Sequence, residues 1–165
     1  MTKTIQCISP VDGQVYAERP ALPLDAAKAA VARAKAAQKD WAALPLDDRI
    51  ARVKAGIAAL NGMKDRVVEE LAWQMGRPTR YGGEFGGVND RTEYMASIAA
   101  ETLAPQVVED SDRFRRYLAR EPVGVVFVIA PWNYPYLTSI NTIVPALIAG
   151  NSVMLKHASQ TLVVG

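Results

Sequence analysis

A continuously apolar, β-branched run from Val125 to Ile129 constrains the fold of this chain more than any other feature. Such a run is typical of a parallel strand that helices bury on both faces. Residues 137–149 then have the pattern of a helix, which Pro145 is expected to bend or interrupt. A second apolar strand is predicted at Ser152–Lys156. This order predicts one right-handed βαβ unit and therefore an α/β fold.

The residues before this unit have the patterns of a hairpin and of helices. A Pro-Asp-Gly turn between two apolar pieces predicts a hairpin within residues 1–22. Helices are predicted at residues 26–41 with Asp25 as the N-cap, between Pro45 and Asn61, at 64–75 with a stop at Gly76, and at 89–101. Helical spacing predicts their buried stripes, which are Ile50, Val53, Ile57 and Leu60, then Val67, Leu71 and Met75, then Tyr94, Ile98 and Ala99.

Two polar segments invite a nucleic-acid or phosphate interpretation that their context opposes. The glycine-rich residues 81–87 lack the Lys-Ser/Thr ending of a phosphate-binding loop, so we interpret them as a helix lead-in. Residues 110–122 carry arginines that partly alternate with apolar residues, which is typical of a half-exposed strand. Acidic neighbours offset these arginines, so a solvated face or a subunit contact is favoured over a nucleic-acid patch.

The composition excludes further classes of partner and site. The 165 residues include 19 basic and 17 acidic ones, so neither nucleic acid nor an acidic membrane is expected. The longest apolar runs are far shorter than the ~20 residues that span a bilayer, and a signal peptide is not recognisable, so we expect a cytoplasmic location. Cys7 has no histidine near it in sequence and is interpreted as a small buried hydrophobe. His157 is the one histidine of the chain, so we expect no metal site built on histidines.

Two segments strongly resemble the aldehyde dehydrogenase superfamily. The first, residues 121–135, contains the Pro131-Trp132-Asn133 turn, and the second, residues 145–156, reads Pro-Ala-Leu-Ile-Ala-Gly-Asn-Ser-Val-Met-Leu-Lys. The Gly76-Arg77-Pro78 turn and the upstream helices are also similar to that family. The resemblance implies a truncated α/β fold. Its parts are an N-terminal helical part at 1–109, an oligomerisation-type strand at 110–122, and an incomplete Rossmann-like βαβ core at 123–165.

Ligands of open α/β sheets bind at the carboxyl ends of the strands, and both segments place residues there. No Gly-x-Gly-x-x-Gly motif is present, so it is the resemblance that implies an NAD or NADP site. The residues expected at this site are Ile129, Ala130, Pro131, Trp132, Asn133, Lys156 and Ser159. Lys156 can donate to ribose hydroxyls or attract a phosphate. The resemblance implies that many NAD-preferring relatives carry glutamate in place of Ser159, and a serine would not repel a 2′-phosphate.

The resemblance also implies the catalytic roles. Asn133 is expected to donate its amide to the substrate oxyanion, although without the resemblance a helix cap is the simpler interpretation. Tyr134 is expected in the substrate tunnel, a position that is easily confused with core packing. The implied reaction oxidises an aldehyde to a carboxylic acid through a cysteine thiohemiacetal. The nucleophilic cysteine and the general-base glutamate are expected beyond Gly165.

We therefore expect a full-length NAD(P)-dependent aldehyde dehydrogenase that acts on a small-molecule aldehyde and forms a homo-oligomer, either a dimer or a tetramer. The 165-residue chain is expected to be inactive alone. One alternative is a non-catalytic cofactor-binding or interaction fragment. A second alternative, an unrelated α/β binding protein, is opposed by the two segments.

Overall fold

The computed structural model describes residues 3–165. A hairpin of β1 (Thr4–Ile8) and β2 (Val15–Pro20) leads to the helices α1 (Leu24–Ala42), α2 (Leu46–Asn61) and α3 (Lys64–Met75). After the short 3₁₀ turn η1 (Thr79–Tyr81) come α4 (Phe85–Leu103) and a second hairpin, β3 (Gln106–Asp110) and β4 (Arg115–Leu118). The chain continues through β5 (Val125–Ile129), α5 (Pro135–Ile148), β6 (Ser152–Lys156) and the 3₁₀ turn η2 (Ser159–Thr161).

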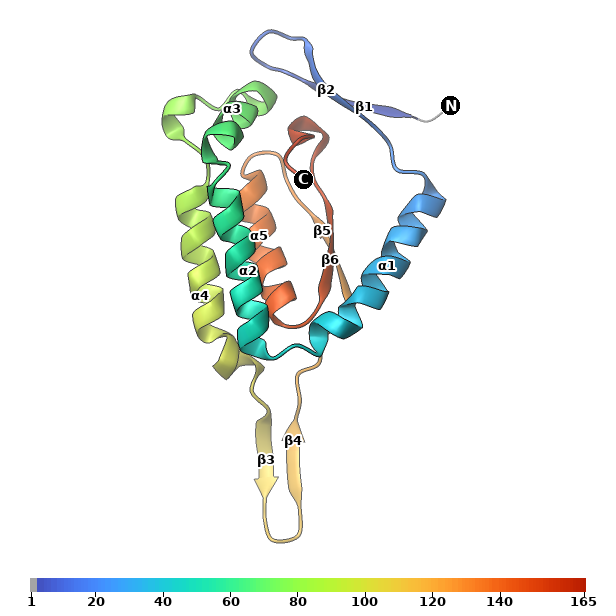
Figure 1. Ribbon diagram of the computed structural model, residues 1–165, viewed down its shortest axis with the longest axis vertical. Coiled ribbons are helices and arrows are strands. Elements are labelled where there is room, and N and C mark those ends of the chain that lie inside the picture. The colour runs from blue at the N-terminus through green and yellow to red at the C-terminus, as the bar shows by residue number, and fades with distance from the viewer. Residues whose placement is uncertain (1–2) are drawn as a thin grey trace.

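The predicted βαβ unit is confirmed. Strands β5 and β6 pair in parallel, with Val125 opposite Ser152 and Ile129 opposite Lys156. Helix α5 lies on one side of this sheet and α1 on the other (Figure 1). Helix α5 runs through Pro145 without interruption.

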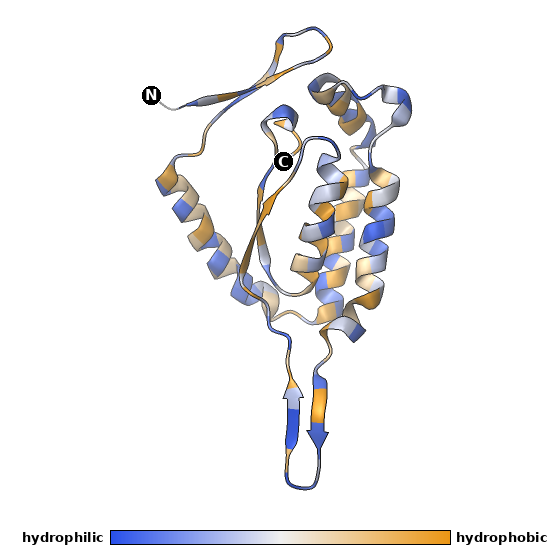
Figure 2. Ribbon diagram, turned by 180° about the vertical axis from the view of Figure 1, so that it is seen from behind, coloured by the Kyte–Doolittle hydropathy of each residue, from blue (hydrophilic) through white to orange (hydrophobic). Residues whose placement is uncertain are grey.

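The expectation that β5 is buried on both faces is wrong for the described residues. Val128 is buried, but Phe127 and Ile129 are 61% and 67% exposed. Helix α1 is hydrogen-bonded to the first residue of β6, because the Ser152 hydroxyl donates to the carbonyl of Ala34 at 2.9 Å. The carboxyl end of β5 stays open, and Figure 2 shows hydrophobic colour along the paired strands there.

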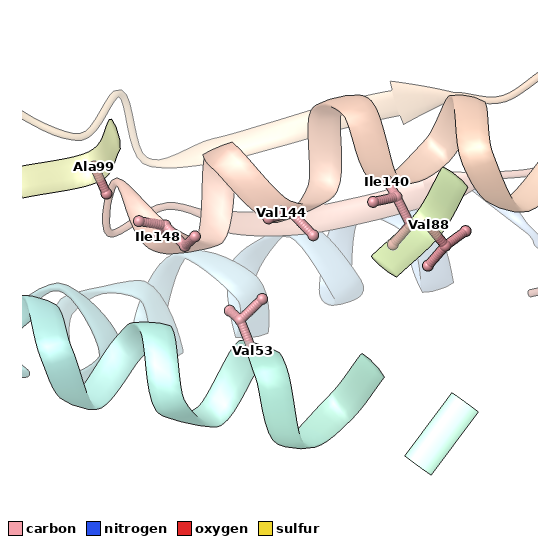
Figure 3. Packing of buried hydrophobic residues seen from close by; sticks show 6 residues of the cluster. All are labelled: Val53, Val88, Ala99, Ile140, Val144 and Ile148. Atoms are coloured by element: carbon pink, nitrogen blue, oxygen red, sulfur yellow. The ribbon is translucent and has the colours of Figure 1, made fainter. Parts of the chain in front are cut away.

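The main core lies between α2, α4 and α5. Val53, Val88, Ala99, Ile140, Val144 and Ile148 form its buried cluster (Figure 3). The predicted stripe of α2 is confirmed, because Ile50, Ile57 and Leu60 pack around this cluster. The predicted face of α4 is partly wrong, since Tyr94 is 54% exposed and Val88 and Thr92 are buried instead.

Helix α4 begins four residues earlier than predicted, so the glycine-rich segment enters its first turn. A Cβ atom at Gly87 would lie 3.1 Å from a methyl group of Leu137 on α5. That distance is tighter than nine in ten real Cβ contacts. The glycine therefore allows α4 and α5 to approach closely, which its low helix propensity alone does not reveal.

The N-terminal part matches most of its predicted elements. The hairpin is confirmed, and Gly76 ends α3 in the left-handed conformation with φ of 72°. The predicted stripe of α3 is also confirmed, since Val67 and Leu71 are buried with Met75 packed against them. The prediction of Asp25 as an N-cap is wrong, because α1 begins at Leu24 after Pro23 and Asp25 lies in its first turn.

The charged segment forms a hairpin that projects from one end of the molecule (Figures 1 and 2). Sequence patterning predicts a strand within residues 110–122, and β4 is shorter than that segment. It pairs with β3, which local patterning missed. Every residue of β4 is exposed. Within residues 3–165, no helix combines the length and the apolar character that crossing a bilayer would require.

Candidate functional site

The two segments singled out by the sequence meet at the carboxyl ends of β5 and β6. Ile129 and Lys156 are register partners, and the next residue, Ala130, donates its N–H to the carbonyl of Lys156 at 3.0 Å. Ala130 is buried, whereas the Ile129 and Lys156 side chains are exposed. Since register partners of parallel strands point to the same face, an apolar surface lies beside an ammonium group at this edge.

Trp132 extends this apolar edge, and its side chain is exposed. Pro131, which precedes it, is half-buried. Ser159 lies at the start of η2, three residues after Lys156, and is also exposed. An apolar ledge flanked by an ammonium and a hydroxyl fits an adenosine with its ribose hydroxyls. The chemistry of the described residues is therefore compatible with the dinucleotide that the resemblance implies.

The segment that carries Ser159 is fastened to the N-terminal part of the chain. Gln74 on α3 is fully buried, and its side-chain oxygen accepts from the N–H of Val163 at 2.9 Å. Gln160 donates to the carbonyl of Ile8 at 3.0 Å. The ring Nε2 of His157 donates to the carbonyl of Leu162 at 2.8 Å, which fits its structural interpretation. Sequence patterning missed Gln74, because a polar residue in the apolar stripe of a helix carries no distinctive local signal.

Cys7 belongs to the same structural cluster. Its side chain is fully buried, and its Sγ donates to the carbonyl of Gln160 at 3.0 Å. Burial raises the pKa of the thiol. A protonated, inaccessible thiol is a poor nucleophile, so the interpretation of Cys7 as a small buried hydrophobe is confirmed.

The turn after β5 presents Asn133 at the surface. The N-cap of α5 is Tyr134, not Asn133, and Tyr134 makes no side-chain capping bond. The N–H of Leu137 in the first turn donates to Oε2 of Glu84 at 2.7 Å. The cap is thus supplied by a distant carboxylate, and the structure contradicts the simpler interpretation of Asn133 as a helix cap.

Behind this turn, the buried Glu84 forms an ion pair with the half-buried Arg77. Arg77 Nη1 lies 2.7 Å from Glu84 Oε1, and the two side chains are 12% and 2% exposed. Arg77 Nη2 donates to the carbonyl oxygen of Asn133 at 2.6 Å. The guanidinium also lies over the ring of Tyr134, 4.9 Å from its centroid. Sequence patterning missed Glu84, whose one signal is an acidic residue directly before a helix in a glycine-rich segment.

A cavity of about 590 Å³ opens in front of this pair. Its lining residues are Arg77, Tyr81, Gly83, Glu84, Gly86, Gly87, Tyr134 and Leu137. Tyr134 is thus on the wall of a cavity rather than in the core. Tyr136 is half-buried and packs against the core clusters, and burial first, then Glu70 and Glu84, raise its pKa to about 12. Tyr136 therefore stays protonated and neutral at physiological pH.

Comparison with known proteins gives a consistent result. The sequence profile described as the Aldehyde dehydrogenase family matches residues 1–165. A benzaldehyde dehydrogenase [NAD(+)] from Pseudomonas putida is 36% identical over 83% of this chain and 28% of its own length. The crystal structure of an NAD-dependent benzaldehyde dehydrogenase from Corynebacterium glutamicum has a TM-score of 0.87 at 30% identity, over 96% of this chain and 35% of that one.

A further solved structure is similar to the same extent. An NADP-dependent glyceraldehyde-3-phosphate dehydrogenase from Bacillus halodurans, complexed with NADP, has a TM-score of 0.86 at 29% identity. The match covers 97% of this chain and 35% of that chain. The chain thus spans about a third of the length of the proteins it matches. The match bears out the predicted fold class.

Proposed function

The chain belongs to the aldehyde dehydrogenase family, and from this premise we propose that the full-length protein oxidises a small-molecule aldehyde to a carboxylic acid with NAD or NADP. The observation that carries the proposal is the meeting of two features at one sheet edge. These are the exposed Ile129–Lys156 pair and the surface turn at Asn133. Relatives with similar folds use NAD in one case and NADP in another, according to their names.

The proposed cofactor site combines an apolar wall with two polar side chains. Ile129, Ala130, Pro131 and Trp132 form the apolar wall, and Lys156 donates to the ribose hydroxyls. Ser159 follows Lys156 by three residues, and in this proposal it faces the 2′ position of the adenosine ribose, where a serine would tolerate a phosphate. When bound, NAD(P) supplies a hydride acceptor. The residues of this chain hold and orient it.

Asn133 is the catalytic residue that we assign to this chain. Attack of a cysteine thiolate on the aldehyde carbon places a negative charge on the carbonyl oxygen, and the Asn133 amide donates to that oxygen. Its side chain is available for this role because the capping bond of α5 is made by Glu84. Tyr134 on the cavity wall contacts the aldehyde substituent in this proposal.

The nucleophile lies outside residues 1–165 in this proposal. Cys7 is the one cysteine of the chain, and it is fully buried with a raised thiol pKa. Covalent attack requires an accessible thiolate. In this proposal residues 1–165 contribute part of the cofactor site and an oxyanion donor to the full-length protein, and alone they have no route to the thiohemiacetal.

The test is to assay the full-length protein against aromatic and aliphatic aldehydes with each cofactor, following NAD(P)H by absorbance. The expected result is reduction of NAD or NADP that depends on the aldehyde and yields the acid. A protein that binds NAD(P) but oxidises no aldehyde in the panel would support a non-catalytic cofactor-binding role instead.

A further inference from the structure

We propose that Glu84 and Arg77 are positioning residues for Asn133, which they hold through its main chain. The inference rests on the proposed function, in which the Asn133 amide binds the substrate oxyanion. It assigns a role to two side chains that precede Asn133 by 49 and 56 residues in the sequence.

A single carboxylate fixes both sides of the turn. Oε2 of Glu84 accepts from the N–H of Leu137, inside α5, and Oε1 accepts from Arg77. Arg77 in turn holds the residue before the helix, because its second terminal nitrogen donates to the Asn133 carbonyl. The planar guanidinium has its donors in a rigid fork, so it fixes the angle between these two partners as well as the distances.

The burial of the pair favours a positioning role over a purely stabilising one. Removing an ion pair from water costs free energy that its attraction often fails to offset, so a buried pair is weak evidence for stability. The low local dielectric nevertheless strengthens its directional hydrogen bonds. The ion pairs Lys54–Glu93 and Arg116–Glu109 are much more exposed. Neither of them is bonded to residues 131–137.

The position of the amide matters because oxyanion stabilisation depends on geometry. Donors act when they lie at hydrogen-bond distance from the place where charge develops. A shift of about 1 Å in a catalytic group can lower the rate roughly a hundredfold. Freeing the Asn133 carbonyl would allow such a shift without altering the exposed cofactor ledge at Ile129 and Lys156.

The experiment uses the full-length protein with Glu84→Gln. Glutamine has the size of glutamate and keeps an oxygen that can accept from the Leu137 N–H. It has no negative charge, however, and its NH₂ group replaces the oxygen that accepts from Arg77. We expect kcat to fall by roughly ten- to a hundredfold, with the dissociation constant of NAD(P) unchanged within about twofold. Glu93→Gln is the matched control, since it breaks the exposed pair with Lys54 by the same chemical change. It should leave kcat unchanged.

A double-mutant cycle separates positioning from stability. In an Asn133→Ala background, Glu84→Gln should lower kcat no further, because there is no amide left to position. A second variant, Arg77→Lys, keeps the charge but not the fork and should behave in the same way. Thermal melting of each variant shows whether the fold is retained, and if Glu84→Gln does not fold, Arg77→Lys decides the question.

The outcomes distinguish this inference from the proposed function. Equal losses of kcat for Glu84→Gln with and without Asn133 would overturn the positioning role while aldehyde oxidation stands. An unchanged kcat, or loss of folding in both variants, would also overturn it and assign the pair to packing alone. A wild-type protein without aldehyde oxidation would overturn the proposed function itself, and with it this inference.

Discussion

Asn133→Ala is the substitution that tests the proposed site most directly. Asn133 is exposed, and the Leu137 N–H in the first turn of α5 donates to Glu84 rather than to Asn133. Alanine keeps the carbonyl that accepts from Arg77 and removes only the side-chain amide. The variant therefore separates the amide from the turn that carries it.

The structure allows the two expected magnitudes to be worked out separately. Removal of one oxyanion donor costs about 2.7–4 kcal/mol of transition-state stabilisation, or roughly a hundred- to a thousandfold in kcat. A surface substitution that breaks no cap changes the free energy of unfolding by about 0.5 kcal/mol or less. The loss in catalysis should thus exceed the loss in stability severalfold.

The assay is steady-state aldehyde oxidation by the full-length protein, together with thermal melting and titration of NAD(P). Thr138→Ala, at an exposed position in the first turns of α5, is a suitable control. An unchanged kcat in Asn133→Ala would refute the oxyanion role. A large fall in the melting temperature would refute the argument that Asn133 is not a structural cap.

Cofactor choice, the activity of residues 1–165 alone and the stability of the βαβ unit can each be tested. Ser159→Glu should lower kcat/KM with NADP relative to NAD by repelling the 2′-phosphate, while the neutral Ser159→Gln should not. If the NADP-to-NAD ratio of kcat/KM were the same in both variants, Ser159 would not be part of the site. Residues 1–165 alone should bind NAD(P) weakly or not at all and reduce none with any aldehyde, and turnover above that of Cys7→Ser would contradict this. Asn151→Ala should destabilise the fold by about 1–3 kcal/mol in urea titrations. The reason is that its buried side chain accepts from Gly124 N–H at 2.9 Å and donates to the Ala146 carbonyl at 3.0 Å. If the urea midpoint were unchanged, these bonds would contribute nothing to stability.

Features with a local periodicity could be predicted from the sequence. The β5–α5–β6 unit was identifiable because two short apolar runs rich in β-branched residues flank a longer segment with the pattern of a helix. The α2 stripe was identifiable for the same reason. Gly76 was identifiable as a helix end because glycine adopts the left-handed conformation without a steric penalty.

Features that depend on distant partners could not be predicted in this way. Strand β3 ends in acidic residues, and it forms by pairing with β4 rather than from strong local preference. The close approach of α4 to α5 at Gly87 and Leu137 likewise involves residues far apart in the sequence. The proposed roles of the site residues, the cytoplasmic location and the homo-oligomer stay predictions.

A contact between residues far apart in the sequence leaves the side chain of Asn133 free of a capping role. From local sequence, an asparagine just before a helix is a plausible cap, and capping would occupy the side chain that catalysis needs. In the structure, the carboxylate of Glu84 accepts from an N–H in the first turn of the helix instead. Arg77 is bonded to the main-chain oxygen of Asn133 and not to its side chain. The buried pair can therefore hold the backbone still while both amide hydrogens remain free for a ligand, which are the two properties that an oxyanion donor requires.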